Sequence, residues 1–118
     1  MKKGFVFPAL FLAFALSVPG GCSLRQTTRF DLYERAERIA ATIESAESKG
    51  ARDCSPRQLA RAKVALEHVL HELEEGYYPP SWTALHFDEA ERLARNLLDE
   101  RILAEASGTV FRCYRSEG

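Results

Sequence analysis

The sequence predicts an all-α protein, an antiparallel helical hairpin extended to a slim three-helix bundle. Apolar residues recur at helical spacing in three segments. Each segment is bounded by residues that start or stop helices. No stretch alternates between apolar and polar residues for long enough to indicate an internal strand. We expect helices at about 29–49, 56–75 and 82–106, within a helical domain of residues 28–106.

The first helix is expected to begin at Thr28. Thr28 and Asp31 have the spacing of a capping box, in which the two residues satisfy each other's backbone N–H groups. Gly50 supplies a stop. The apolar side of this helix comprises Leu32, Tyr33, Ala36, Ile39, Ala40 and Ile43.

The second helix has the clearest start in the chain. Ser55 is placed as the N-cap, Pro56 as the first helical residue and Gln58 at the third position. Gly76 closes the helix. Its apolar stripe comprises Leu59, Ala62, Leu66, Val69, Leu70 and Leu73.

The third helix follows Tyr77, Tyr78 and a pair of prolines, with Ser81 as its expected cap. Its main stripe comprises Ala90, Leu93, Ala94, Leu97, Leu98 and Ala104. At 100° per residue, Leu85 and Leu103 point away from that stripe. Ser107 and Gly108 end the helix, and residues 107–118 form a C-terminal tail.

The N-terminus has the layout of an export signal. Lys2 and Lys3 precede an apolar run over residues 4–18, which as a helix is about 22 Å long. That is short of the roughly 30 Å hydrocarbon core of a bilayer. The alternatives to a signal peptide cleaved directly after this region are an uncleaved N-terminal anchor and an ordinary signal that is cleaved at another position.

The stretch Val18-Pro19-Gly20-Gly21-Cys22 resembles the lipobox of bacterial lipoproteins, although Pro19 stands where that family usually has Leu. The resemblance implies a signal peptide over residues 1–21, a diacylated thiol and an N-acyl group on Cys22, and a lipidated tether over residues 22–27. A non-acidic residue such as Ser23 after the cysteine implies an outer-membrane lipoprotein that faces the periplasm. Acyl chains on Cys22 would hold the domain on a membrane without a spanning helix.

Cys54 and Cys113 are candidates for a disulfide. Cys54 lies just before the second helix and Cys113 just after the third, so an antiparallel hairpin brings them to the same end. An exported protein meets an oxidising compartment, in which disulfides persist. Free or intermolecularly paired thiols remain the alternative.

Residues 50–105 resemble a small helical domain of unknown function found in bacterial envelope lipoproteins, often ahead of an OmpA-like domain. The matching features are the Cys54-Ser55-Pro56 helix start, the Glu75-Gly76-Tyr77-Tyr78 turn, and the His86-x3-Ala90-x3-Ala94 series. Pro79 to Trp82 lengthen the turn relative to that pattern. No OmpA-like sequence follows in the 118 residues, so we expect no direct peptidoglycan-binding domain in this chain.

Candidate chemistry is sparse. His68, His71 and Glu75 have spacings that can place metal ligands on one helix face. The helical angle, however, directs His68 and His86 to different sides, so we expect neither a metal centre nor a cofactor. No nucleophile–base motif is present, and we expect no catalytic residues and no enzyme activity. The Arg/Glu-rich faces are expected to be solvated surfaces with i,i+4 pairs.

Composition excludes nucleic acid as the main partner. Lys2 and Lys3 lie in the signal, so residues 22–118 carry 14 basic against 17 acidic groups, whereas phosphate binding requires a basic excess. The sequence instead indicates a non-catalytic structural or interaction module that binds another envelope protein. The candidate interaction residues are Tyr77, Tyr78, Trp82, Leu85 and Leu103, and the alternative for the three aromatic residues is that they cap the core. The alternative is a small-ligand or metal-binding lipoprotein using His68, His71 and Glu75.

Overall fold

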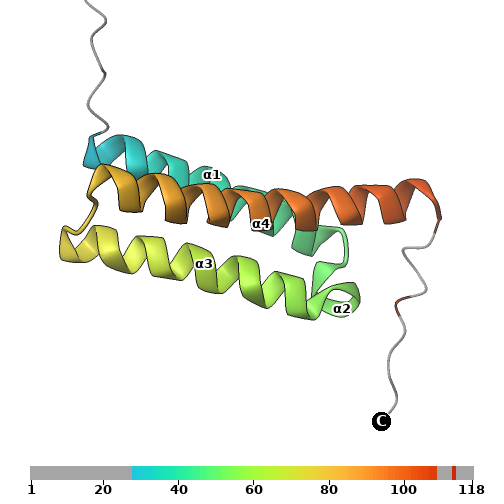
Figure 1. Ribbon diagram of the computed structural model, residues 1–118. Coiled ribbons are helices and arrows are strands. Elements are labelled where there is room, and N and C mark those ends of the chain that lie inside the picture. The colour runs from blue at the N-terminus through green and yellow to red at the C-terminus, as the bar shows by residue number, and fades with distance from the viewer. Residues whose placement is uncertain (1–27, 109–112, 114–118) are drawn as a thin grey trace, which may run out of the picture.

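In the computed structural model, which describes residues 28–108 and Cys113, the chain is a helical bundle (Figure 1). The helices are α1 (Arg29–Ser48), α2 (Ala51–Cys54), α3 (Pro56–Glu75) and α4 (Pro80–Ala106). α1, α3 and α4 each pack against the other two and run in alternating directions, while α2 is a single turn between α1 and α3. The predicted all-α fold class is confirmed.

The start of α1 has the predicted capping box. The Thr28 hydroxyl accepts a hydrogen bond from the backbone N–H of Asp31 at 3.1 Å. The Asp31 carboxylate accepts one from the Thr28 N–H at 2.9 Å. These bonds satisfy backbone donors that the helix itself leaves unpaired.

Ser55 is the N-cap residue of α3, as predicted, with Pro56 at the first helical position. Its side chain makes no capping hydrogen bond; the hydroxyl instead donates to a carboxylate oxygen of Glu100 at 2.8 Å, which links the start of α3 to α4. The predicted Ser81 cap is wrong. Ser81 lies inside α4, because that helix begins at Pro80 with Pro79 as the cap residue. Proline suits the first helical position because its missing N–H would be unpaired there in any case and its fixed φ matches the helix.

The turn between α3 and α4 is set by Gly76, which has a φ of 79°. That left-handed conformation suits glycine because it has no Cβ. The Tyr77 N–H then donates to the Glu72 carbonyl at 2.8 Å, and the Gly76 N–H donates to the Leu73 carbonyl at 3.1 Å. This Schellman motif ends α3 and reverses the chain toward α4.

The core is narrow because six of its fourteen apolar residues are alanines. The buried apolar residues are Leu32, Ala36, Ile39, Ile43, Ala46, Ala51, Leu59, Ala62, Val69, Leu73, Phe87, Ala90, Ala94 and Leu97. Phe87 is the largest fully buried side chain, and it lies one turn before the part of α4 in which the sequence analysis placed the apolar stripe. Within the part of the chain that the structure describes, no helix is long and apolar enough to cross a bilayer.

The two ends of the bundle differ. We call one the turn end, because it holds the α3–α4 turn together with the first residue of α1 (Figure 1). There the Arg29 guanidinium donates to the backbone carbonyl of Glu74 at 3.5 Å. The opposite end, the far end, holds α2 and the last turns of α4. At the far end a disulfide joins Cys54 to Cys113, with the two Cα atoms 4.8 Å apart.

Candidate functional site

An open groove of about 670 Å³ runs between α3 and α4. The grooves of the α1–α3 and α1–α4 faces are smaller, at about 390 and 200 Å³. The floor of the α3–α4 groove is apolar and includes Val64, which is 64% exposed. The residues that line it are Arg57, Ala60, Arg61, Val64, Ala65, His68, Glu89, Arg92 and Leu93.

The two arginines of α3 in this groove are unfavourably placed within their own helix. Arg57 and Arg61 are exposed, lie one turn apart, and make no ion pair with any other described residue. Like charges at this spacing repel. Arg57 also lies in the first turn of α3, where the helix dipole already presents partial positive charge. Their contribution to the isolated domain is therefore slightly destabilising.

The α4 side of the groove is electrically balanced. Arg92 donates two hydrogen bonds to the Glu89 carboxylate, at 2.6 and 2.8 Å. This contact lowers the pKa of Glu89 and raises that of Arg92. Arg57 and Arg61 therefore give the groove a net positive charge.

A cluster of four rings continues the groove toward the turn end. The Trp82 ring lies 4.5 Å from His86, 5.5 Å from His68 and 5.8 Å from Tyr77, measured between centroids. The His68 and His86 rings are 5.0 Å apart in an edge-on arrangement. Because His68 also lines the groove, the groove and the ring cluster form one continuous surface.

This cluster corrects the prediction that the histidines point in different directions. His68 and His86 meet because α4 packs against α3, and the angle on a single helix does not give this relation between two helices. The alternative set of metal ligands, His68, His71 and Glu75, does not come together at one site either. His71 pairs with Glu75 at 3.3 Å on an exposed surface, whereas His68 lies in the ring cluster. No three His, Cys, Asp or Glu side chains among the described residues converge to hold a metal ion.

The five predicted interaction residues do not form one surface. Tyr78 and Trp82 are half-buried against the core, while Tyr77 and Leu85 are 52% and 67% exposed near the turn end. Leu103 is 70% exposed but lies at the far end. Leu85 and Leu103 are 18 residue steps apart, which corresponds to about 27 Å along α4.

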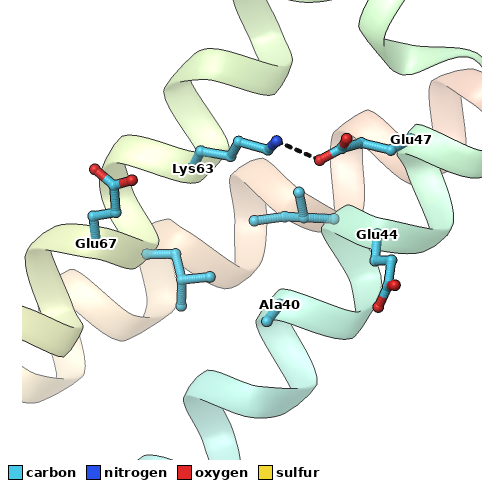
Figure 2. Close-up of a pocket in the computed structure, with 7 residues that line it drawn as sticks. Ala40, Glu44, Glu47, Lys63 and Glu67 are labelled. Carbon is cyan, nitrogen blue, oxygen red and sulfur yellow. Dashed lines mark ion pairs between the residues drawn. The ribbon is translucent and has the colours of Figure 1, made fainter.

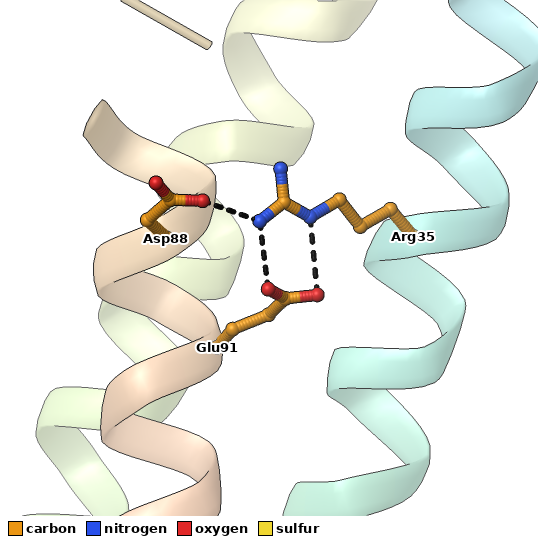
Figure 3. A network of polar contacts seen from close by, with 3 residues as sticks. All are labelled: Arg35, Asp88 and Glu91. Atoms are coloured by element: carbon orange, nitrogen blue, oxygen red, sulfur yellow. Dashed lines mark hydrogen bonds and ion pairs between the residues drawn. The ribbon is translucent and has the colours of Figure 1, made fainter. Parts of the chain in front are cut away.

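The α1–α4 face is closed by an ionic clamp (Figure 3). The Arg35 guanidinium binds Glu91 through two hydrogen bonds, at 2.7 and 3.0 Å, and Asp88 at 2.6 Å. It also lies 5.3 Å from the centroid of the Phe87 ring. The hydrogen bond with Arg35 lowers the pKa of Glu91, and the one with Glu91 raises that of Arg35.

The α1–α3 face is acidic (Figure 2). Glu44, Glu47 and Glu67 line its groove, and the Lys63 ammonium is the cation among the lining residues. Lys63 from α3 forms an ion pair with Glu47 from α1, and this contact is the main cause of the lowered pKa of Glu47. The opposite signs of the α1–α3 and α3–α4 grooves give the bundle an uneven charge distribution.

The α3–α4 groove was not predicted from the sequence. Two signals could have indicated it: arginines at the start of α3, against the helix dipole, and Val64 outside the apolar stripe of that helix. Both are visible in the sequence, but neither identifies the neighbouring helix that completes the groove.

The predicted signal peptide, Cys22 and the tether lie outside the described residues, as does the tail except Ser107, Gly108 and Cys113. Compared with known protein families, with curated proteins and with solved structures, the chain gives no match.

Proposed function

We propose that this chain is a lipid-anchored helical adaptor of the bacterial envelope, a non-catalytic module that holds a partner protein near the membrane. The anchor is acylated Cys22, and the resemblance of residues 18–22 to a lipobox supports it. Ser23 favours an outer-membrane location, with the bundle in the periplasm. A tethered domain meets membrane-bound partners at high effective concentration, so a modest interface suffices.

The observation that carries the adaptor role is the α3–α4 groove. It combines an open apolar floor with two arginines that have no acidic partner among the residues that the structure describes. An amphipathic helix that lies in such a groove buries its apolar face and sets its charges against those of the rim. The chemistry that fits is therefore an acidic amphipathic helix of another envelope protein.

Crosslinking in cells tests this role. A photoreactive residue at Val64 is expected to give a discrete adduct, whose partner peptide, mapped by mass spectrometry, is an acidic amphipathic segment. The same residue at Ala41, on the outward side of α1, is the position-matched control and should give no such adduct. Reversing both groove charges, with Arg57→Glu and Arg61→Glu, should abolish the adduct, whereas Arg38→Glu on α1 should not.

Two outcomes contradict the proposal. One is a set of adducts that is the same at Val64 and Ala41. The other is an adduct only of twice the mass of the chain, which would mean that a second copy of the chain occupies this face.

A further inference from the structure

The exposed apolar side chains at the turn end lie where the tether enters the bundle. Phe30, the second residue of α1, is 69% exposed, although most of the apolar residues of α1 are buried. Tyr77 projects from the α3–α4 turn of the same end, and Leu85 lies in the second turn of α4. The bundle itself leaves these three apolar side chains largely uncovered.

The position of the anchor decides what covers this end. Six residue steps separate Cys22 from Thr28, so the intervening chain spans at most about 22 Å. The helix that follows begins at the turn end, beside the α3–α4 turn (Figure 1). An acylated Cys22 therefore confines the turn end, rather than the far end, to the neighbourhood of the lipid surface.

We infer that the turn end is a membrane-contact surface, in which Phe30, Tyr77 and Leu85 enter the interfacial layer of the bilayer that holds the acyl chains. The inference rests on the lipid anchor of the proposed function. Tyrosine and tryptophan suit this layer because each has an apolar ring and a polar atom that stays hydrated. Contact through the turn end orients the bundle so that the α3–α4 groove stays clear of the lipid and accessible to a partner.

The charges of the turn end specify the lipid. Arg29 donates to the Glu74 carbonyl and keeps its positive charge, but the two exposed carboxylates of Glu74 and Glu75 beside the turn outnumber it. These carboxylates oppose an anionic surface. The lipid surface that fits is therefore a neutral, zwitterionic one, and contact should not require anionic headgroups.

The only tryptophan of the chain supplies the probe. Trp82 is half-buried next to Tyr77, so its fluorescence reports on the turn end. The acylated mature product, which begins at Cys22, is reconstituted into phosphatidylcholine vesicles, with or without bromine on the lipid acyl chains near the headgroup. We expect brominated lipid to remove most of the Trp82 emission. The matched control is the Trp82→Phe, Leu103→Trp double variant, which carries the fluorophore at the far end and should keep its emission.

Substitutions at the surface sharpen the test. Phe30→Ser together with Tyr77→Ser should restore most of the Trp82 emission, whereas Ile102→Ser at the far end should leave the quenching unchanged. Equal quenching of the Trp82 protein and the double variant would overturn the inference, because the bundle would then lie flat on the bilayer. Quenching that requires anionic lipid would overturn it as well.

Vesicle flotation separates this inference from the proposed function. A protein that floats with the vesicles but shows no quenching of Trp82 refutes the membrane-contact surface and leaves the anchor intact. A protein that lacks acyl chains and does not float refutes both.

Discussion

The α1–α4 and α3–α4 faces both carry arginines, but the arginines have different surroundings. On the α1–α4 face, Arg35 is held by two carboxylates and by the Phe87 ring, so its charge is neutralised within the bundle. On the α3–α4 face, Arg57 and Arg61 have no described acidic partner and border an open apolar floor. Arg35 is paired within the fold, whereas Arg57 and Arg61 are the charges that we propose a partner helix binds. Substitutions on the α1–α4 face should therefore change stability, whereas substitutions on the α3–α4 face should change binding.

The largest expected effect concerns how the α3–α4 hairpin is held at the far end. The Cys54–Cys113 disulfide closes a loop with a sequence separation of 59. Cys113→Ser should lower the free energy of unfolding by about 4 kcal/mol, because the unfolded chain regains the entropy of that loop. Urea unfolding checks this, with reductant as the internal control: it should destabilise the parent and leave the variant unchanged. Equal stability of parent and variant would mean that noncovalent packing alone holds the hairpin.

Removing the clamp tests the α1–α4 face. Arg35→Leu keeps an apolar stem over Phe87 but removes the hydrogen bonds to Glu91 and Asp88. We expect a loss of about 1 kcal/mol in the free energy of unfolding, since both carboxylates can rehydrate. Crosslinking from Val64 should persist. Arg38→Leu, at an exposed arginine of the same helix, is the control. An equal loss in both variants would show that the clamp contributes nothing specific.

The ion pair of Arg35 with Glu91 should also make the free energy of unfolding depend on pH. Because the folded-state pKa of Glu91 lies below its ordinary value of 4.5, its contribution is complete above that value and is lost as the pH falls through the lowered pKa. Glu91→Gln should therefore be less stable than the parent at neutral pH, and the gap should close on acidification. Thermal unfolding across this pH range measures the gap. Glu37→Gln, at an exposed position of α1, should show no such convergence, and convergence in both variants would contradict the assignment.

The smallest effect on stability is expected on the α3–α4 face. Arg57→Glu combined with Arg61→Glu should leave the free energy of unfolding unchanged or raise it by a few tenths of a kcal/mol, roughly the gain from matching the helix dipole. The same variant should lose the Val64 crosslink. A substantial loss of stability would show that these arginines serve the fold and would remove the basis for the groove as a docking site.

The sequence predicted the features that are encoded locally. Helix starts and stops depend on residues within one turn, so Thr28, Pro56 and Gly76 placed helix ends correctly. The last helix was predicted to start at about residue 82, after a Ser81 cap, whereas the structure begins it at Pro80. These differences are small because backbone hydrogen bonding at a helix end is a short-range property.

Features that join two helices could not be predicted in the same way. The sequence suggested solvated i,i+4 pairs, but Arg35 binds residues more than 50 positions away. Arg101, which reads as a surface residue, is buried beside Glu100, and its Nε has no hydrogen-bond partner within the described chain. The meeting of His68 with His86 likewise depends on where α4 packs around α3. A helical angle fixes the direction of a side chain, whereas the packing of neighbours decides what it contacts.

The most direct test of the account is the state of Cys22. The full-length chain is expressed in a diderm bacterium fed a clickable palmitate analogue, with Cys22→Ala as the control, and the mature product is analysed by intact mass spectrometry. The account predicts a membrane-bound product that begins at Cys22, carries acyl chains, and is labelled only when Cys22 is present. A product that begins at Met1, with an unmodified thiol at position 22 and no label, would contradict it.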